Sequence, residues 1–430
     1  MTGSTGTGAE ARPRAVPRPR RRPRGGRRTA CGGAAVAAAL ALAAALAALA
    51  ALPAAVMAKT YPDVPPGHWA YRYIDAVTDR SAAGKRLLDD YRTVFRPERA
   101  ITREQLARTL VLASGHYGDE FTPVEIPDVP VGYRYYRVIQ LAVALKLMSV
   151  DSRGCFQPTK AVTAAKAEAA VVRWLKLRYP SADWTLLRSL RPSVWEPDEG
   201  WTTGAPSYLP WVVAARQLRL RYNHPAGEDG EEVAPTQPVD RAEVAYMLYR
   251  GYQLADEWTM AGLADLATVT FGPLSERQRQ VARLALKYVG YPYVWGGEYP
   301  TPDSPYGPQA AGGFDCSGFV FYVMKLRLGY PLTDAERGAS DMARNARPRL
   351  RRDELACGDL VFFGPDGPDS KAADIYHAGL YLGNGWFIHS TGSSDGVTLC
   401  SLDRSSYWKA AFAWGRRLLT PEELAVGSDQ

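Results

Sequence analysis

Apolar residues recur at helical spacing in three separate stretches of the first 254 residues. Each stretch follows a short loop, and spacings of three and four residues place the apolar side chains on one helical face. Thr102 and Asp240 stand where a helix N-cap is expected, with Gln105 and Glu243 three residues later as capping-box partners. The pattern predicts three helices that bury the following positions: Leu106, Leu110 and Val111; Ala169, Val172 and Leu175; Val244, Met247 and Leu248.

These stretches close the copies of a longer internal repeat. Pro-Asp-Val-Pro at 62–65 returns at 127–130, and Phe-Arg-Pro at 95–97 returns as Phe-Gln-Pro at 156–158. A third and more diverged copy ends in Val-Asp-Arg-Ala-Glu at 239–243. Each unit is expected to hold two helices joined by a loop and to bury its apolar face against a neighbour. We assign the three units to residues 59–120, 121–187 and 188–256.

A different pattern follows residues 257–276, which we interpret as a linker. Ser275 begins a predicted helix, a second helix is expected over 317–328, and strand-like apolar runs come after it. Gly383-Asn384-Gly385 separates two of these runs, as in a β-hairpin. Residues 277–420 therefore predict an α+β domain large enough for its own core, followed by a tail at 421–430.

The charge of the chain is concentrated at its beginning. Of the 430 residues, the first 28 carry nine arginines and one glutamate, so the formal net charge of +7 leaves −1 for the remainder. An alanine- and leucine-rich run and Ala-Ala-Val-Met-Ala at 54–58 follow, as in a signal peptide cleaved after Ala58. An uncleaved membrane anchor is the alternative. The near-neutral body argues against a nucleic-acid partner. The leader predicts a secreted protein.

Five cysteines, one of them in the leader, do not form a disulfide framework. Cys357 and Cys400 could pair in an oxidising compartment, or remain buried reduced thiols.

The strongest chemical signal is Cys316, which begins the predicted helix at 317–328. Free backbone N–H groups at a helix N-terminus, together with an imidazolium, are expected to lower a thiol pKa and make it a nucleophile. His377 and His389 lie in the two later strand-like runs. If the three residues converge, they form a nucleophile, a general base and an orienting group.

The length of the hairpin loop decides whether the two histidines share a face. A two-residue loop would pair Leu380 with His389 and place His377 on the opposite face. A three-residue loop pairs Gly379 with His389 and makes His377 its diagonal neighbour, about 7–8 Å away on the same face. We predict the three-residue loop, with an apolar face on the other side made of Ala378, Leu380, Leu382 and Ile388.

Other interpretations of these residues remain open. Each of the three could be a structural core residue, and a zinc site from Cys316, His377 and His389 lacks a closely spaced ligand pair. Asp315 is either an N-cap for the helix of Cys316 or a substrate contact. No metal or organic cofactor is expected.

The three repeats resemble the S-layer homology (SLH) domain, a wall-anchoring module. The resemblance spans roughly 60–254 and implies mostly helical units that contact an acidic cell-wall polymer. It implies Trp69, Arg103 and Arg241 as the polymer-binding residues, and the second unit departs from the pattern with Arg134 and Ala164.

The last domain resembles an NlpC/P60 peptidase in five blocks between 277 and 420. These blocks are Tyr-Pro-Tyr-Val-Trp-Gly-Gly at 291–297, Phe-Asp-Cys-Ser-Gly at 314–318, Gly-Asp-Leu-Val-Phe-Phe at 358–363, His-Ala-Gly-Leu-Tyr-Leu-Gly at 377–383 and Phe-Ile-His at 387–389. The resemblance implies a papain-like α+β fold with Cys316, His377 and His389 as catalytic residues. It also implies that Tyr293, Asp315 and Ser317 line the substrate pocket. The segment 298–311 is longer than the family's usual link, and its prolines suggest a stiff loop at the rim of the cleft.

These features together predict a secreted endopeptidase of the cell wall. Its substrate would be peptidoglycan stem peptides, cut between D-glutamate and a diamino acid, and its repeats would hold it at the envelope. Contact with a membrane would come only from an uncleaved leader. The alternative is a non-catalytic wall-binding protein with a peptidase-like domain.

Overall fold

The computed structural model describes residues 60–426, apart from 83, 89–92, 191–193, 197–199, 203–205, 223–231, 255–262, 265, 267, 345–346 and 393–395. The chain divides into the units Met1–Met57 and Ala58–Gln430. The predicted signal peptide and the start of the predicted linker lie outside the described residues. Within the part of the chain that the structure describes, no helix is long and apolar enough to span a membrane.

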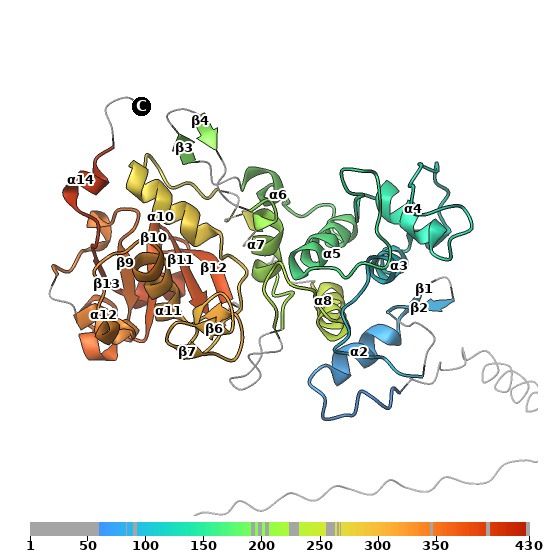
Figure 1. Cartoon of the computed structure of the whole chain (residues 1–430), viewed down its shortest axis with the longest axis horizontal. Helices are drawn as coiled ribbons and strands as arrows, with labels where there is room; N and C mark the ends of the chain where they lie inside the picture. The colour runs from blue at the N-terminus through green and yellow to red at the C-terminus, as the bar shows by residue number, and fades with distance from the viewer. Residues whose placement is uncertain are drawn as a thin grey trace, which may run out of the picture. The chain divides into compact units, whose positions relative to one another are not determined.

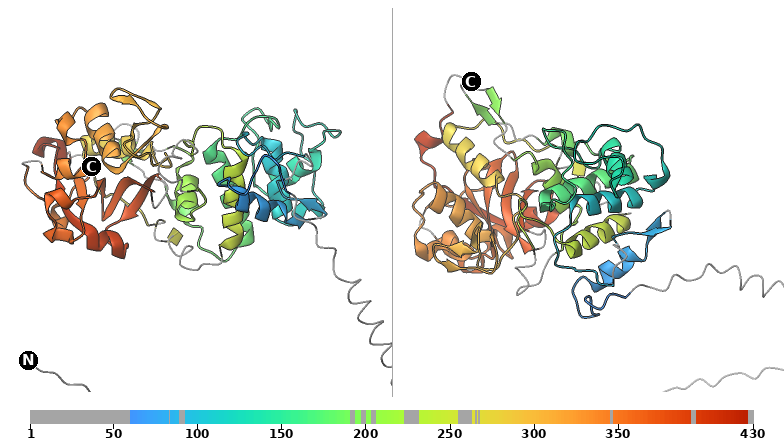
Figure 2. Two further views of the ribbon diagram at one scale, coloured as in Figure 1. Left: turned by 90° about the horizontal axis from the view of Figure 1, so that it is seen from below. Right: turned by 45° about the vertical axis from the view of Figure 1, so that its right-hand side comes forward.

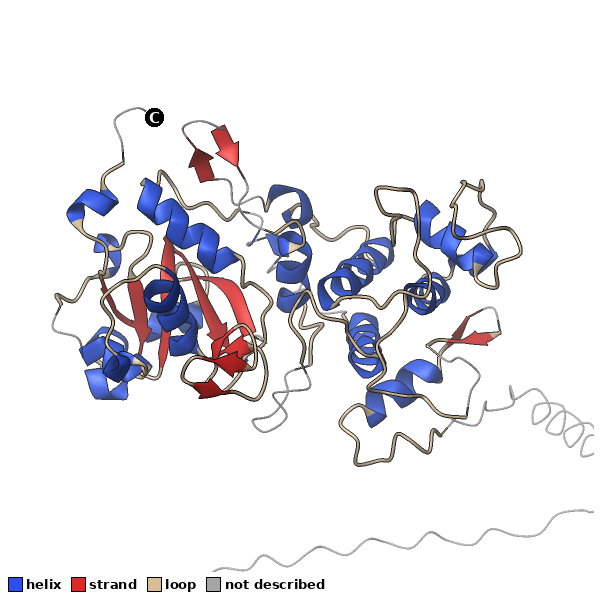
Figure 3. Cartoon of the chain, in the orientation of Figure 1, coloured by secondary structure: helices blue, strands red, loops and turns tan. Residues whose placement is uncertain are grey.

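The part before residue 254 is mainly helical, as Figure 3 shows. Its closing helices begin where the sequence predicts them: Asp240 Oδ1 accepts the N–H of Glu243 at 2.8 Å, and Gln105 Oε1 accepts the N–H of Thr102 at 3.0 Å. The helices are α2 (Tyr71–Thr78), α3 (Arg103–Ala113), η1 (His116–Gly118), α4 (Tyr136–Ala144), α5 (Ala164–Arg178), α6 (Leu186–Ser189), α7 (Leu209–Gln217) and α8 (Arg241–Gln253). The strands are β1 (Ser81–Ala82), β2 (Lys85–Arg86), β3 (Val194–Glu196) and β4 (Gly200–Thr202).

A closed set of backbone hydrogen bonds joins the three segments that precede α3, α5 and α8. The N–H of Ile101 donates to the carbonyl of Val239 at 3.0 Å, that of Val162 to Ile101 at 2.9 Å, and that of Val239 to Val162 at 2.9 Å. All three side chains are fully buried. The three segments therefore hold equivalent positions around one centre, and α5 packs against both α3 and α8 (Figure 1).

The later part combines helices with one five-stranded antiparallel sheet, the α+β class that the sequence predicts. The strand order is β12-β11-β10-β9-β13, and the strands lie together as one layer in all views of Figures 1 and 2. The sheet strands are β9 (Leu360–Phe363), β10 (His377–Gly383), β11 (Trp386–Thr391), β12 (Gly396–Ser401) and β13 (Phe412–Arg416). The short strands are β5 (Glu298–Tyr299), β6 (Asp303–Ser304), β7 (Gly307–Pro308) and β8 (Gly313–Phe314). The helices are α10 (Glu276–Leu286), α11 (Cys316–Phe321), η2 (Tyr322–Arg327), η3 (Asp334–Glu336), α12 (Ala339–Arg344), η4 (Arg352–Glu354), η5 (Gly367–Asp369), η6 (Ala372–Asp374), α13 (Ser406–Ala411) and α14 (Pro421–Leu424).

The hairpin between β10 and β11 has the predicted register but not the predicted loop. Gly383 pairs with Trp386, so the turn contains two residues, Asn384 and Gly385, both with positive φ as a type I′ turn requires. A register shift between Tyr381 and Gly383 inserts one extra residue, a β-bulge. Because the bulge adds one residue to β10, Leu380 pairs with Ile388, which is the same pairing that a three-residue loop would produce.

This register separates the side chains of the sheet onto two faces. Ala378, Leu380, Leu382 and Ile388 belong to the larger core, as predicted, together with Phe319 of α11. The opposite face forms a second cluster that includes Phe363, Phe387 and Trp408. The rings of His377 and His389 lie against this second cluster, with centroids 4.9 and 4.8 Å from that of Trp408.

Candidate active site

Cys316 is the first residue of α11, as the sequence predicts. The helix begins here because Asp315 Oδ1 accepts the N–H of Gly318 at 2.6 Å, so the N-cap interpretation of Asp315 is confirmed. Glycine is required just before it, because a Cβ on Gly313 would lie 2.5 Å from the carbonyl oxygen of Pro292. The expected helix continues beyond Phe321 as the π-helical segment η2.

Five of the predicted residues line one pocket of about 550 Å³. Cys316 from α11 and His377 from β10 both line it, and α11 packs against β10 and β11. The three residues expected to contact substrate also line it: Tyr293, Asp315 and Ser317.

The two histidines are joined directly by a hydrogen bond. His377 Nε2 lies 2.7 Å from His389 Nδ1, with the two rings perpendicular. His377 is 7% exposed and His389 is fully buried. With its Nε2 held by His389, His377 has Nδ1 left to exchange a proton with a thiol.

The electrostatics of the thiol differ from the expectation. Burial and, as a smaller cause, the neighbouring Asp315 carboxylate together raise the pKa of Cys316 to about 11. The backbone N–H groups of Ala378 and Ser317 act in the opposite direction but do not compensate. Burial also lowers the pKa of His377 to about 3. The prediction of a lowered thiol pKa is therefore wrong, because desolvation outweighs the helix N-terminus, and the pair of Cys316 and His377 is neutral.

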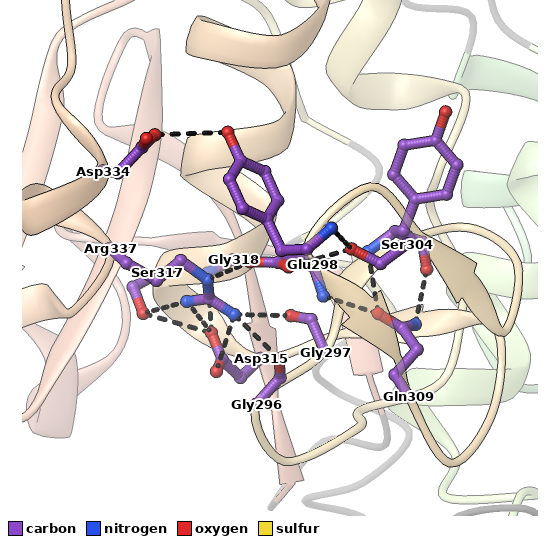
Figure 4. Close-up of polar contacts among 12 residues, drawn as sticks. Gly296, Gly297, Glu298, Ser304, Gln309, Asp315, Ser317, Gly318, Asp334 and Arg337 are labelled. Atoms are coloured by element: carbon purple, nitrogen blue, oxygen red, sulfur yellow. Dashed lines mark hydrogen bonds and ion pairs between the residues drawn. The ribbon is translucent and has the colours of Figure 1, made fainter.

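Arg337, which no sequence motif marked, lines the pocket and contacts several of its residues (Figure 4). Its Nε donates to Glu298 Oε2 at 2.6 Å, and Nη1 and Nη2 donate to the two carboxylate oxygens of Asp315 at 3.1 and 3.2 Å. Nη1 also donates to Ser317 Oγ, and Nη2 to the carbonyls of Gly296 and Gly297, each at 3.0 Å. One guanidinium therefore fixes both the turn before Cys316 and Glu298, the residue that begins the long segment 298–311.

That long segment is an ordered loop at the edge of the pocket. Gln309 Oε1 accepts the N–H groups of Glu298 and Tyr299, and its Nε2 donates to the carbonyl of Tyr299 (Figure 4). Nε2 also donates to the carbonyls of Ala311 and Gly313. Ser304 Oγ donates to Glu298 Oε1 at 2.9 Å. Glu298 lines the pocket, so the loop contributes a carboxylate to it. The prolines and the length of this segment are the only features that its sequence pattern marked.

The residues expected to bind a wall polymer occupy different environments. Trp69 stacks on Tyr222 with ring centroids 4.6 Å apart. Arg241 is 2% exposed, and its guanidinium donates to the carbonyls of Phe95 and Leu88 in the interior.

Arg103 makes contacts similar to those of Arg241, with the carbonyls of Phe156 and Ser149, but it also lines a pocket of about 580 Å³. The pocket has an excess of basic over acidic side chains and includes an aromatic surface, where Arg173 lies 4.3 Å from the ring of Trp211. Its other charged residues are Lys160, Lys166 and Asp151. Of these pocket residues, only Arg103 was predicted to bind a polymer. The remaining charged residues lie between residues 151 and 173, Trp211 lies in α7, and no sequence motif marked them.

All four cysteines in the described part of the chain are free thiols. Cys357 Sγ lies 3.7 Å from the carbonyl of Gln278, whereas Cys400 Sγ lies 3.2 Å from His389 Nε2, so the two do not pair. Across the described ranges, no group of three or more His, Cys, Asp or Glu side chains is arranged to hold a metal ion.

Comparison with known proteins identifies the class of the later domain. Residues 290–417 match the NlpC/P60 family. Murein DD-endopeptidase MepH from Escherichia coli is 37% identical over 143 residues, which is 32% of this chain and 45% of that protein. The probable peptidoglycan endopeptidase LytE from Bacillus subtilis is 36% identical over 131 residues, covering 30% of this chain and 31% of that protein.

A solved structure of the peptidoglycan hydrolase RipB from Mycobacterium tuberculosis is also similar. It is 30% identical, covers 34% of this chain and 66% of that chain, and has a TM-score of 0.26. The chain spans less than half the length of the two curated relatives named above. Residues 290–417 are thus an NlpC/P60 domain, which makes this part of the chain a cysteine-peptidase hydrolase.

Proposed function

We propose that this protein is a cell-wall endopeptidase that hydrolyses amide bonds in peptidoglycan stem peptides. The observation that carries the proposal is the common pocket of Cys316 and His377, with His377 Nε2 hydrogen-bonded to His389 at 2.7 Å. A nucleophile, a base and a group that orients the base are the parts that acyl transfer requires.

In this proposal His377 acts as a general base, because the resting thiol is neutral. As Cys316 Sγ attacks the scissile carbonyl carbon, His377 Nδ1 takes the thiol proton, and the imidazolium donates through Nε2–H to His389 Nδ1. The proton then passes to the leaving amine, the C–N bond breaks, and a thioester remains on Cys316. Water, deprotonated by His377, hydrolyses the thioester and regenerates the thiol.

The charge of the pocket suits a substrate that carries an amine. Glu298 and Asp315 contribute two carboxylates against the single guanidinium of Arg337, so the pocket wall keeps an excess negative charge. Tyr293, Asp315 and Ser317 are the proposed substrate contacts, with Asp315 and Ser317 held in place by Arg337.

The proposed scissile bond joins D-glutamate to a diamino acid, as the resemblance to the family implies. One relative is named a DD-endopeptidase and another, CwlT of Bacillus subtilis, a muramidase and DL-endopeptidase. The competing outcome is therefore cleavage between two D-residues. Mass spectrometry of the products from a defined stem peptide distinguishes the two bonds.

We propose further that the leader directs secretion and that the three repeats are SLH modules that hold the enzyme at the envelope. The pocket around Arg103, Lys166 and Arg173 is the proposed site for an acidic wall polymer, because its basic side chains outnumber its acidic one. Trp69 remains a proposed polymer contact. Arg241 is fully engaged inside the protein and is proposed here to stabilise the fold.

Digestion of purified muropeptides by the wild type, Cys316→Ala and Cys155→Ala tests the proposal. Cys155 lines the basic pocket of the repeats, so its substitution controls for the loss of a thiol. We expect new products from the wild type and Cys155→Ala and none from Cys316→Ala. Equal product from all three would refute the thiol mechanism, and binding of muropeptides without any product would favour a non-catalytic wall-binding protein.

A further inference from the structure

A third side chain continues the row formed by His377 and His389. In the sheet, His389 on β11 pairs with Thr398 on β12, so Cys400 is its diagonal neighbour on the same face. Cys400 Sγ lies 3.2 Å from His389 Nε2, on the side of the ring opposite to His377. One polar row therefore runs across β10, β11 and β12.

The proposed reaction requires one particular tautomer of His389. When His377 becomes an imidazolium, its Nε2–H needs an acceptor, and His389 Nδ1 can accept only if the proton of the neutral ring is on Nε2. That Nε2–H is fully buried and itself needs an acceptor. The sulfur of Cys400 is in position to accept it.

The surroundings of Cys400 also favour its sulfur as an acceptor. The side chain of Trp408 makes a hydrogen bond to Cys400, and an indole N–H can only donate. The same indole ring packs against both His377 and His389. The Cys400 sulfur can thus accept hydrogen bonds from the indole N–H of Trp408 and from Nε2–H of His389.

We infer that Cys400 is a positioning residue that holds His389 in the Nε2–H tautomer. The inference rests on the proposed function of Cys316 and His377. In the other tautomer, His389 Nδ1–H would donate to His377 Nε2, and the proton of neutral His377 would then be on Nδ1. That nitrogen could no longer accept the proton of the thiol.

Substitution of Cys400 separates this role from a merely structural one. Cys400→Ala leaves the buried Nε2–H without an acceptor, so we expect kcat to fall roughly tenfold, the factor typical of one lost buried hydrogen bond, with KM little changed. Cys400→Ser supplies a hydroxyl oxygen in the same place and restores most of the activity. Cys357→Ala, which removes a buried free thiol outside both pockets, is the control thiol substitution.

The tautomer itself is measured by long-range ¹H–¹⁵N NMR of the histidine rings in the full chain, which contains only five histidines to assign. We expect His389 to carry its proton on Nε2 in the wild type and in Cys400→Ser, and to shift toward Nδ1 in Cys400→Ala. A wild-type ring protonated on Nδ1, or a Cys400→Ala variant with unchanged tautomer and kcat, would overturn the inference. If Cys400→Ala does not fold, the His389 tautomer in the wild type and in Cys400→Ser still tests the inference. If the wild type hydrolyses no muropeptide, the proposed function fails while the tautomer remains measurable.

Discussion

Replacing Arg337 by methionine should loosen the turn that precedes Cys316. Its guanidinium donates to two carboxylates that are themselves largely buried, with side-chain exposures of 11% for Glu298 and 15% for Asp315. Methionine has similar length and can fill the space, but it provides no donor. Both carboxylates then lose their cation, and the carbonyls of Gly296 and Gly297 lose a donor.

The size of the effect follows from the exposure of these groups. Removing one partner of a buried ion pair typically costs about 3–5 kcal/mol. Arg337 is 24% exposed, so water reaches part of the site and the lower end, about 3 kcal/mol, is appropriate. At about 1.4 kcal/mol per factor of ten, local opening of the segment 296–318 should become more than about 100-fold more frequent.

Amide hydrogen exchange measured by mass spectrometry detects such local opening. We expect faster exchange in 296–318 of Arg337→Met and unchanged exchange in α3. Arg344→Met is the matched control, because its ion pair with Asp341 is 52% and 41% exposed and should contribute at most about 1 kcal/mol. Adding Glu298→Gln to Arg337→Met removes one unpaired carboxylate and should recover part of the protection. If exchange in 296–318 is the same in Arg337→Met and Arg344→Met, the guanidinium does not hold this turn.

Four further variants test other parts of the structure. Gly383 has a backbone φ of +118°, and in Gly383→Ala the new Cβ would overlap the carbonyl oxygen of Phe271. The free energy of unfolding measured in urea should therefore fall by about 2–3 kcal/mol. An unchanged free energy of unfolding would contradict the bulged hairpin. Arg241→Ala should lower the thermal midpoint but preserve binding to purified cell walls. Arg173→Ala should leave the thermal midpoint unchanged but weaken that binding. Weaker binding in Arg241→Ala with normal binding in Arg173→Ala would refute the assignment of the basic pocket. Because the pKa of His377 is about 3, only the unfolded chain binds this proton between pH 6.5 and 3, so stability falls as pH falls through that window, and His377→Gln should flatten this part of the curve.

Local signals in the sequence predicted much of the catalytic domain. Asp315 caps α11 and Ser275 caps α10 because short polar side chains bond free N–H groups wherever a helix begins, a purely local rule. Strand alternation likewise places His377 and His389 on one face. The register that places both histidines on one face was predicted for the wrong reason, because the hairpin has a two-residue turn and a bulge in place of the three-residue loop.

Effects that depend on tertiary packing could not be predicted in this way. The sign of the Cys316 pKa shift depends on how much water the folded pocket excludes, and Arg337 reaches Asp315 only because its segment folds back across 22 residues. The burial of Arg241 follows from the way the three segments that precede α3, α5 and α8 close around one centre. The contact of Cys400 with His389 depends on β12 being the neighbour of β11, and local sequence patterns do not determine the order of strands in a sheet.

The central claim is that Cys316 forms a thioester with the stem peptide, and trapping this intermediate tests it most directly. The wild type is mixed with muropeptides, quenched in acid within the first turnovers, digested with a protease and analysed by mass spectrometry. The account predicts an acyl adduct on the peptide that contains Cys316, and none in Cys316→Ala. Continued hydrolysis by Cys316→Ala, or an adduct on Cys400 in place of Cys316, would contradict it.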